Sequence, residues 1–243
     1  IIPVLGSAPV DDARMRKDAK EQELLRDAGR INDLAIAYGL SHVDAAVTEA
    51  ELAKQIDAFF LAHGGKQVGQ YQVVCYGANA AQPHHMSDDT LPRPGDSVLI
   101  DLVCPINDYW CDMTRTVFYR QVSEQHRQIY EVVRRAQQAG IDFVRPGVRM
   151  SQIDAAVRQV IVDAGYGAAF ITRTGHGIGL MVHEPPDVST ACDAVAQEGM
   201  VFSIEPGIYL PGDTGVRIED LVLVTADGCE VLTHYPKELQ IIL

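Results

Sequence analysis

The arrangement of segments along the sequence predicts an α+β fold. Helical and strand-like stretches come in blocks, helices then strands and again helices then strands, which favours segregated layers over alternating βαβ units. Of the 243 residues, 47% are hydrophobic and 22% are charged, which is an ordinary globular composition. No low-complexity tract interrupts the chain after residue 12. We therefore expect one domain at residues 12–243, behind a linker at residues 1–11.

The first block is helical. A charged helix is expected from Asp12 to about Tyr38, because leucine, isoleucine and alanine recur there at helical spacing. Thr48 and Glu51 have the spacing of a capping box, and a helix over Leu52–Ala62 would follow them. Two consecutive glycines then end that helix.

The remaining blocks are strands, helices and strands. Residues rich in β-branched and aromatic side chains predict the first strands, over Gln72–Tyr76, Ser97–Val103 and Tyr109–Tyr119. Serine caps and closing glycines predict helices from Ser123 to Ala139 and from Ser151 to Ala164. Later strands are expected over Ala169–Thr172, Met200–Glu205 and Val216–Thr225, the last paired with Glu230–Thr233. Two helix-then-hairpin halves result, which hints at an internal duplication.

The charge balance limits the partners. Lysine and arginine number 20 against 33 aspartates and glutamates, so the net charge is −13. Nucleic acids and anionic membrane surfaces are bound through basic patches, which argues against both as partners. No apolar run approaches the ~20 residues of a transmembrane helix, and no signal peptide is visible. The five cysteines form an odd set without a CxxC pair, which favours reduced thiols and a cytoplasmic location.

Two aspartates interrupt apolar strands. Asp101 follows Val98-Leu99-Ile100, and Asp112 lies 11 residues later in a similar setting. A hairpin loop centred between Ile106 and Asn107 would place them directly opposite each other, about 5 Å apart. Buried carboxylates at that distance share a proton or a cation. The alternative is a pair of surface aspartates on an edge strand.

Two glutamates repeat this pattern near the C-terminus. Glu205 ends one apolar strand and Glu219 ends another 14 residues later. The prolines and glycines between them supply turn residues. An odd-length loop centred on Gly212 would place the two glutamates opposite each other. Arg217 could neutralise only one of the four acids.

Histidines complete the candidate site. His176 lies in an alternating glycine stretch, Gly175-His176-Gly177-Ile178-Gly179, which suits backbone that approaches something closely. Four carboxylates and an imidazole form a hard, oxygen-rich ligand set, which suits manganese, with cobalt, iron or zinc as alternatives. Upstream, His84 and His85 lie in a polar loop, where an ordinary loop histidine is an equal alternative. Arg115 has two equal interpretations, a charge that supports the site or a residue on the surface.

At this point the sequence resembles the prolidase and aminopeptidase P peptidases. The resemblance runs from about Asp12 to the C-terminus and rests on four signatures in order: Ile100-Asp101 through Asp112-Met113-Thr114-Arg115-Thr116, Gly175 to Leu180 with His183-Glu184, Ile204 to Tyr209, and Gly215 to Asp220. It implies the pita-bread fold, with pseudo-twofold related halves around a central curved antiparallel sheet. It also implies two divalent metal ions in the cleft.

The resemblance assigns roles position by position. The metal ligands it implies are Asp101, Asp112, His176, Glu205 and Glu219. The catalytic residues it implies are His84, His183, Glu205 and Arg217. The implied activity is hydrolysis of Xaa-Pro bonds by an aminopeptidase or a dipeptidase, through a hydroxide held between the metal ions. The implied partner is a peptide substrate with proline at its second position. A homodimer is a further expectation.

Several departures and alternatives accompany this assignment. Val103 stands where family members usually have glycine. The stretch Glu184–Ile204 contains no lysine or arginine. Dipeptidases of this group tend to place a basic residue there to bind the substrate carboxylate. Its absence favours longer peptides as substrates. The family's N-terminal domain has no counterpart in this sequence, which begins at Ile1, so we expect the catalytic part only. The alternative functions are a metal-free amidinohydrolase and an inactive binding module of the same fold.

Overall fold

The computed structural model describes residues 8–66 and 72–243. Their helices are α1 (Ala8–Met15), α2 (Ala19–Ser41), α3 (Glu49–Ala62), α4 (Glu124–Phe143) and α5 (Met150–Asp163), with 3-10 turns η1 (Gly77–Ala81) and η2 (Gly167–Ala169). Their strands are β1 (Val73–Tyr76), β2 (Ser97–Ile106), β3 (Tyr109–Tyr119), β4 (Gly175–Gly177), β5 (Glu184–Val188), β6 (Val201–Ile204), β7 (Gly207–Leu210), β8 (Thr214–Arg217), β9 (Asp220–Val224), β10 (Cys229–Val231) and β11 (Ile241–Ile242).

The start of the chain differs from the predicted linker. Residues 1–7 of that linker lie outside the described residues, but residues 8–11 belong to α1, so the prediction is wrong for them. Pro9 fits the first turn because no hydrogen bond of the helix needs its missing N–H. The single helix expected from Asp12 to Tyr38 is also wrong. Asp18 accepts hydrogen bonds from the backbone of Lys20 and Glu21 and thereby begins a second helix, α2.

The other predicted helices are confirmed with changed ends. Thr48 forms the expected capping box at the start of α3, and Ser123 caps α4. α4 runs past Gly140, which serves close packing, since a Cβ there would lie 2.6 Å from Val157 of α5. The N-cap of α5 is Arg149, so the prediction of a Ser151 cap is wrong.

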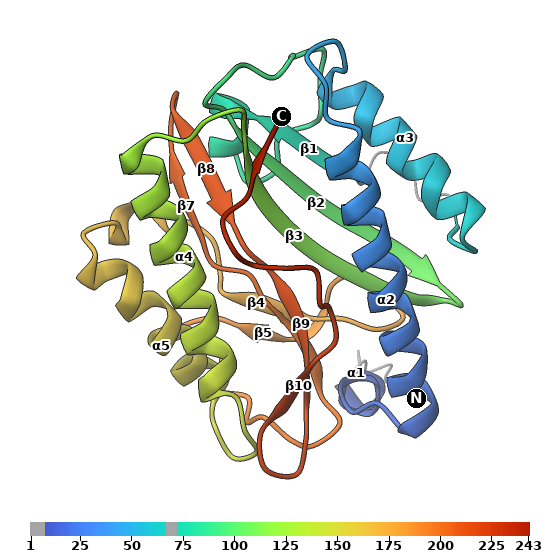
Figure 1. The fold of residues 1–243 in the computed structure, drawn as a ribbon. Helices are drawn as coiled ribbons and strands as arrows, with labels where there is room; N and C mark the ends of the chain where they lie inside the picture. The colour runs from blue at the N-terminus through green and yellow to red at the C-terminus, as the bar shows by residue number, and fades with distance from the viewer. Residues whose placement is uncertain (1–7, 67–71) are drawn as a thin grey trace, which may run out of the picture.

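The strands form three antiparallel groups around the centre of the molecule. The strand orders are β1-β2-β3-β11, β10-β9-β6-β4-β5 and β7-β8, with only the β3–β11 pair parallel among the described strands. Figure 1 shows α2 and α3 on the β1–β3 side and α4 and α5 on the β7–β10 side. The predicted α+β class is therefore confirmed. The strand expected over Ala169–Thr172 is wrong, since no strand forms there.

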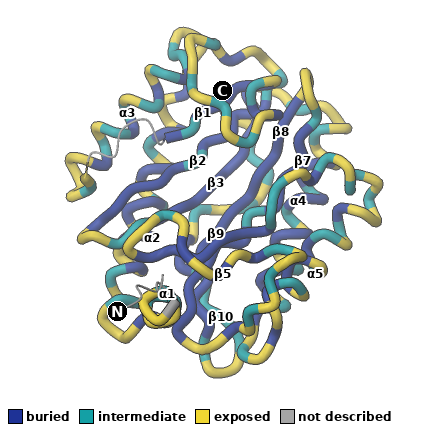
Figure 2. Tube along the Cα trace, turned by 180° about the vertical axis from the view of Figure 1, so that it is seen from behind, coloured by how far each residue is buried: buried dark blue, intermediate teal, exposed yellow. Residues whose placement is uncertain are grey.

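Two large apolar clusters form the core. One joins α2 and α3 to β1, β2 and β3, and the other joins α4 and α5 to β6, β8 and β9. The central strands β2, β3 and β9 are buried along most of their length (Figure 2). Acidic side chains inside these strands are therefore held away from bulk water, at the place where the two halves meet.

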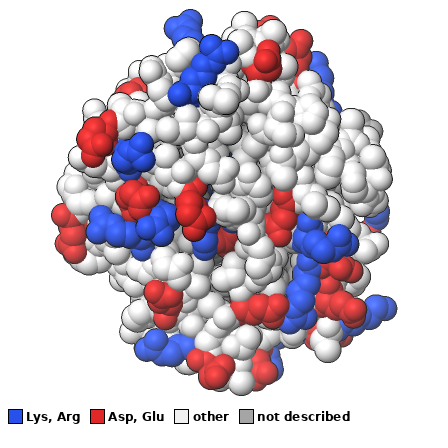
Figure 3. Space-filling view, viewed as in Figure 1, with Lys and Arg blue, Asp and Glu red and all other residues white. Residues whose placement is uncertain are grey.

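The surface agrees with the charge analysis. On the face drawn in Figure 3, lysine and arginine are interspersed with aspartate and glutamate. Among the described helices, none is both long enough and apolar enough to cross a membrane.

Candidate metal centre

One cavity collects the candidate side chains. It has a volume of about 420 Å³, and its lining includes His84, Asp101, Asp112, His176, His183, Glu205, Arg217 and Glu219. An adjoining cavity of about 570 Å³ shares His84, His176, His183 and Glu205 with it and extends to Arg173. All residues proposed from the sequence for metal binding or catalysis thus line a single site.

The first acid hairpin differs from the expected register by two residues. Asp101 lies opposite Thr114, and Asp112 lies opposite Val103. The cause is the turn, where Asn107 and Asp108 both have positive φ, so the loop is centred one residue later than expected. Because side chains alternate with a period of two, the change keeps both aspartates on the same face as diagonal neighbours.

The second acid hairpin has the expected register. Gly207 pairs with Arg217, and Ile204 pairs with Asp220, which places the loop centre at Gly212. The ladder is interrupted between these two pairs, where Glu205 and Glu219 lie. Their side chains are therefore positioned by a break in the strands between two flanking ladders.

The site combines side chains from both hairpins and from β4. Asp112, His176 and Glu219 are buried and offer ligand atoms within 4.8 Å of one another. His176 Nε2 lies 3.5 Å from Asp112 Oδ2 and 3.3 Å from Glu205 Oε1. Its Nδ1 lies 3.1 Å from the Gly177 carbonyl, an acceptor that fixes the Nδ1–H tautomer and leaves the Nε2 lone pair toward the acids.

A hydrogen-bond network holds the remaining acids. The Thr114 hydroxyl donates to Glu219 Oε2 at 2.7 Å and accepts from Arg217 Nε at 3.0 Å. Arg217 also donates to Asp101 Oδ2 at 2.6 Å and to the Tyr209 hydroxyl at 2.9 Å. The guanidinium therefore orients Asp101 and partly compensates the acid cluster.

Arg115 neither lines the cavity nor lies on the surface. Its side chain is 1% exposed and pairs with Asp220 at 2.6 Å. It also donates to the Glu219 carbonyl oxygen. The surface alternative for Arg115 is wrong, and its contact fixes the backbone that carries Glu219.

The acids of the cluster raise one another's pKa values. Burial raises the pKa of Asp112 well above its usual range, and the charges of Asp101 and Glu205 raise it further. Burial likewise raises the pKa of Glu219, with Asp112 and Glu205 adding to it. Carboxylates packed this closely oppose one another's ionisation unless a cation lies among them.

The donor set fits divalent metal ions. Asp101 Oδ1 and Glu219 Oε1 are buried, and no described protein group hydrogen-bonds to either atom. Such orphaned acceptors are costly unless something binds them. Four carboxylates with one imidazole supply hard oxygen ligands and one nitrogen, which suits manganese, iron, cobalt or zinc.

Two histidines border the acids. The His183 ring lies edge-on to the His176 ring, with centroids 4.3 Å apart. Burial lowers the pKa of His183 to about 4, helped by the charges of His176 and Arg173, so its imidazole is neutral near pH 7. His84 is exposed on the loop after η1 and lines the same cavity.

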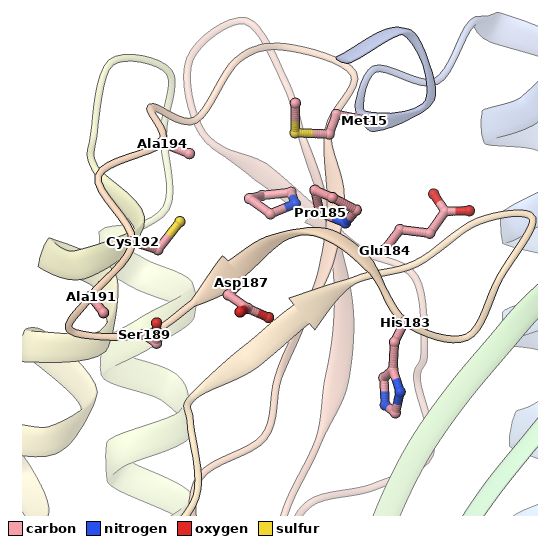
Figure 4. Close-up of a pocket in the computed structure, with 10 residues that line it drawn as sticks. Met15, His183, Glu184, Pro185, Asp187, Ser189, Ala191, Cys192 and Ala194 are labelled. Carbon is pink, nitrogen blue, oxygen red and sulfur yellow. The ribbon is translucent and has the colours of Figure 1, made fainter. Parts of the chain in front are cut away.

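Each of these histidines lies beside an anchored neighbour. His85 Nε2 lies 3.0 Å from the buried Glu49 Oε2, which ties the His84 loop to α3. Glu184, next to His183, pairs with Arg14 and with the buried Lys17 of the N-terminal segment. Figure 4 shows His183 and Glu184 pointing to opposite sides of the chain. Anchors of this kind hold both loops against the sheet.

The sequence reasoning missed several supporting residues. Thr114 and Tyr209 occur within the signatures without an assigned role, although both bond to Arg217. Ser203 was also missed. Its hydroxyl donates to Glu205 Oε1 at 3.1 Å and accepts from the His176 backbone at 3.0 Å. The available signal was a polar side chain at an inward position of an apolar strand, as at Asp101.

Known proteins resemble this chain along most of its length. The model of metallopeptidase family M24 matches residues 23–226. The Xaa-Pro dipeptidase of Lactobacillus delbrueckii subsp. lactis is 44% identical over 94% of this chain and 62% of its own length. The structure of dipeptidase PepE from Mycobacterium ulcerans superposes with a TM-score of 0.95 at 40% identity, over 99% of this chain and 65% of that one.

An aminopeptidase structure is also similar. The X-Pro aminopeptidase from Thermotoga maritima MSB8 superposes with a TM-score of 0.93 at 33% identity, over 96% of this chain and 66% of that one. The present chain thus spans about 62% of the length of the Lactobacillus delbrueckii dipeptidase.

Proposed function

The chain belongs to metallopeptidase family M24, and from that membership we propose that it is a metal-dependent exopeptidase that hydrolyses Xaa-Pro bonds. The pita-bread fold expected from the sequence is confirmed by the solved relatives. The observation that carries the proposal is the gathering of all eight candidate side chains around one cavity. Residues 12–243 would then form the catalytic domain.

The proposed ligands are Asp101, Asp112, His176, Glu205 and Glu219. Four carboxylates balance two dications, and the two orphaned carboxylate oxygens support this donor set. Bound divalent ions supply Lewis acidity and make a water nucleophilic near neutral pH. We propose manganese as the native metal, since the donor set is mostly hard oxygen.

Protons are handled by the chain's own residues. Glu205 is partly exposed to the cavity and hydrogen-bonded by Ser203, so its carboxylate can accept a proton from the attacking water. The nitrogen of an Xaa-Pro bond carries no hydrogen, and it must be protonated as the bond breaks. Glu205 is the proposed carrier of that proton.

The histidines would bind the reacting carbonyl. His183 is neutral near pH 7, so its N–H can donate a hydrogen bond to the oxygen that gains negative charge. His84 lines the same cavity and is proposed to orient the peptide. Arg217 holds Asp101 in place from a buried position.

The cellular location and the partners of the enzyme are also proposed. All five cysteines are free, which supports a cytoplasmic location. The substrate would be a peptide with proline at its second position. The mass of the protein in solution would test whether it forms a homodimer.

Metal analysis with a ligand variant tests the proposal. The purified protein, dialysed with manganese, is expected to hold about two equivalents of metal and to cleave an Xaa-Pro peptide. Glu205→Ala should lose metal and activity together. An unaltered peptidase activity in Glu205→Ala would contradict the assignment. Absence of bound metal would favour the amidinohydrolase or the binding module.

A further inference from the structure

One wall of the site is a segment without regular structure. Residues 170–174 lead from η2 to β4 and form neither helix nor strand. Ile171, Thr172 and Arg173 of this segment line the adjoining cavity beside Glu205. Because no strand ladder runs along these residues, other groups have to satisfy their backbone and fix their position.

Arg158 of α5 binds the backbone of this segment. Its guanidinium donates from Nη1 to the Phe170 carbonyl oxygen at 3.1 Å and from Nη2 to the Thr172 carbonyl oxygen at 3.0 Å. The same group lies over the Phe170 ring, 4.1 Å from the ring centroid. Arg158 therefore supplies the hydrogen-bond donors that a neighbouring strand would otherwise supply.

Asp154 holds both this arginine and the end of the segment. Its side chain is fully buried, and it accepts hydrogen bonds from Arg158 Nη2 at 3.0 Å and from Nε at 3.1 Å. Its Oδ1 also accepts from the Thr174 hydroxyl at 2.7 Å. A two-point contact between a carboxylate and a guanidinium has a defined geometry. One carboxylate thus joins α5 to a residue that lies two positions before His176.

Thr174 connects this network to Glu205. The backbone N–H of Glu205 donates to the Thr174 carbonyl oxygen at 2.7 Å. Glu205 lies in the break between β6 and β7, where the ladder is interrupted. The contact with Thr174 therefore holds the Glu205 backbone, whereas the Ser203 hydroxyl bonds to the Glu205 carboxylate.

Asp154 and Arg158 lie outside both cavities. Burying a carboxylate costs free energy that its ion pair recovers only in part, so a buried pair is weak evidence for stability alone. The contacts of this pair are directional, and they end at the segment and at Thr174. Their main consequence is therefore a fixed position for the wall of the site.

We propose that the Asp154–Arg158 pair positions the metal centre, because it fixes residues 170–174 and, through Thr174, the place of Glu205. The inference rests on the proposed role of Glu205 as metal ligand and proton carrier. Asp154 and Arg158 act through other residues and are positioning residues. Groups that orient a metal ligand from outside typically change metal affinity about 10- to 100-fold.

Thr174→Val tests the link to Glu205, since valine has nearly the same shape but no hydroxyl for Asp154. Manganese affinity, measured by competition with a metal-binding dye, should fall about 10-fold. The visible spectrum of the cobalt-loaded protein should also change, because Glu205 shifts. Arg158→Lys should act in the same way, since lysine keeps the charge but lacks the planar fork that spans both carbonyl oxygens. Thr174→Ser keeps the hydroxyl and should stay close to wild type in both measurements.

Ala155→Gly is the matched control for helix stability. Ala155 is exposed on α5 next to Asp154, and glycine there should lower Tm but leave the affinity and the spectrum unchanged. Wild-type affinity in Thr174→Val or in Arg158→Lys, or an equal loss in Ala155→Gly, would overturn the inference while the peptidase function stands. A wild-type protein that binds no manganese and cleaves no Xaa-Pro peptide would overturn the proposed function and this inference with it.

Discussion

The Thr114 hydroxyl illustrates how a single side chain prepares the site. It donates to Oε2 of Glu219 and accepts from Arg217. The other Glu219 oxygen, Oε1, receives no hydrogen bond from the described residues. A carboxylate held in this way keeps one oxygen free as a ligand atom at the cavity. Supporting contacts of this kind determine how tightly metal ligands hold their ion.

Thr114→Val should weaken metal binding. Valine has nearly the same shape but leaves Glu219 and Arg217 without their shared partner. We expect manganese affinity to fall about 10- to 100-fold, measured by competition with a metal-binding dye. Thr214→Val is the control, since Thr214 is also buried and its hydroxyl bonds to Ser97, outside the site. Wild-type affinity in Thr114→Val would show that the hydroxyl plays no supporting role.

At the scale of elements, α3 positions the loop that carries His84. Glu49 lies in the first turn of α3 and is fully buried. Its carboxylate accepts hydrogen bonds from the backbone of Tyr76 and Asp88 and from the Asn79 amide, and it contacts His85. One carboxylate thus connects the end of β1 to both sides of the His84 loop.

Glu49→Gln should reduce activity without removing metal. The amide NH₂ of glutamine meets groups that are themselves donors, so part of the loop anchor is lost. We expect kcat/KM to fall about 10-fold or more, with bound metal unchanged.

Glu51→Gln is the control for this prediction. Glu51 lies in the same helical turn, is exposed, and closes the capping box with Thr48. It should affect stability slightly and leave the kinetics unchanged. Equal kinetic effects in both variants would mean that helix stability, rather than the loop anchor, is responsible.

At the scale of the whole molecule, the proposed ions join two halves. Asp101 and Asp112 come from β2 and β3 of the first half, whereas His176, Glu205 and Glu219 come from the second. The two halves have separate apolar cores. Without cations, the acids of both halves repel one another where the halves meet.

Metal binding should therefore raise the melting temperature. At a free manganese concentration 100 times its Kd, each bound ion adds about 2.7 kcal/mol to the free energy of unfolding, so the two proposed ions together add about 5 kcal/mol. For a chain of this size we expect a rise of about 10–20 °C in Tm relative to chelator-treated protein. Differential scanning calorimetry measures it, and Glu205→Ala should show a much smaller rise. Equal Tm values with and without manganese in the wild type would contradict the prediction.

The sequence by itself determined the α+β class and most of the helices and strands, because these depend on local periodicity and capping. It also located Asp101, Asp112, Glu205 and Glu219, because a charged residue inside an apolar strand is visible without any fold. The register of the first hairpin could not be obtained in this way. It depends on which two residues take positive φ, and neither Asn107 nor Asp108 is glycine.

Only the tertiary structure decided which supporting residues meet the site. Glu49, Thr114 and Arg173 are ordinary residues in the sequence, and their contacts span from 14 to 105 positions along the chain. A contact between residues far apart depends on the packing of whole elements, which local patterns do not encode. The acids of the site were therefore predictable as residue types in strands, while the groups that orient them emerged only from the folded chain.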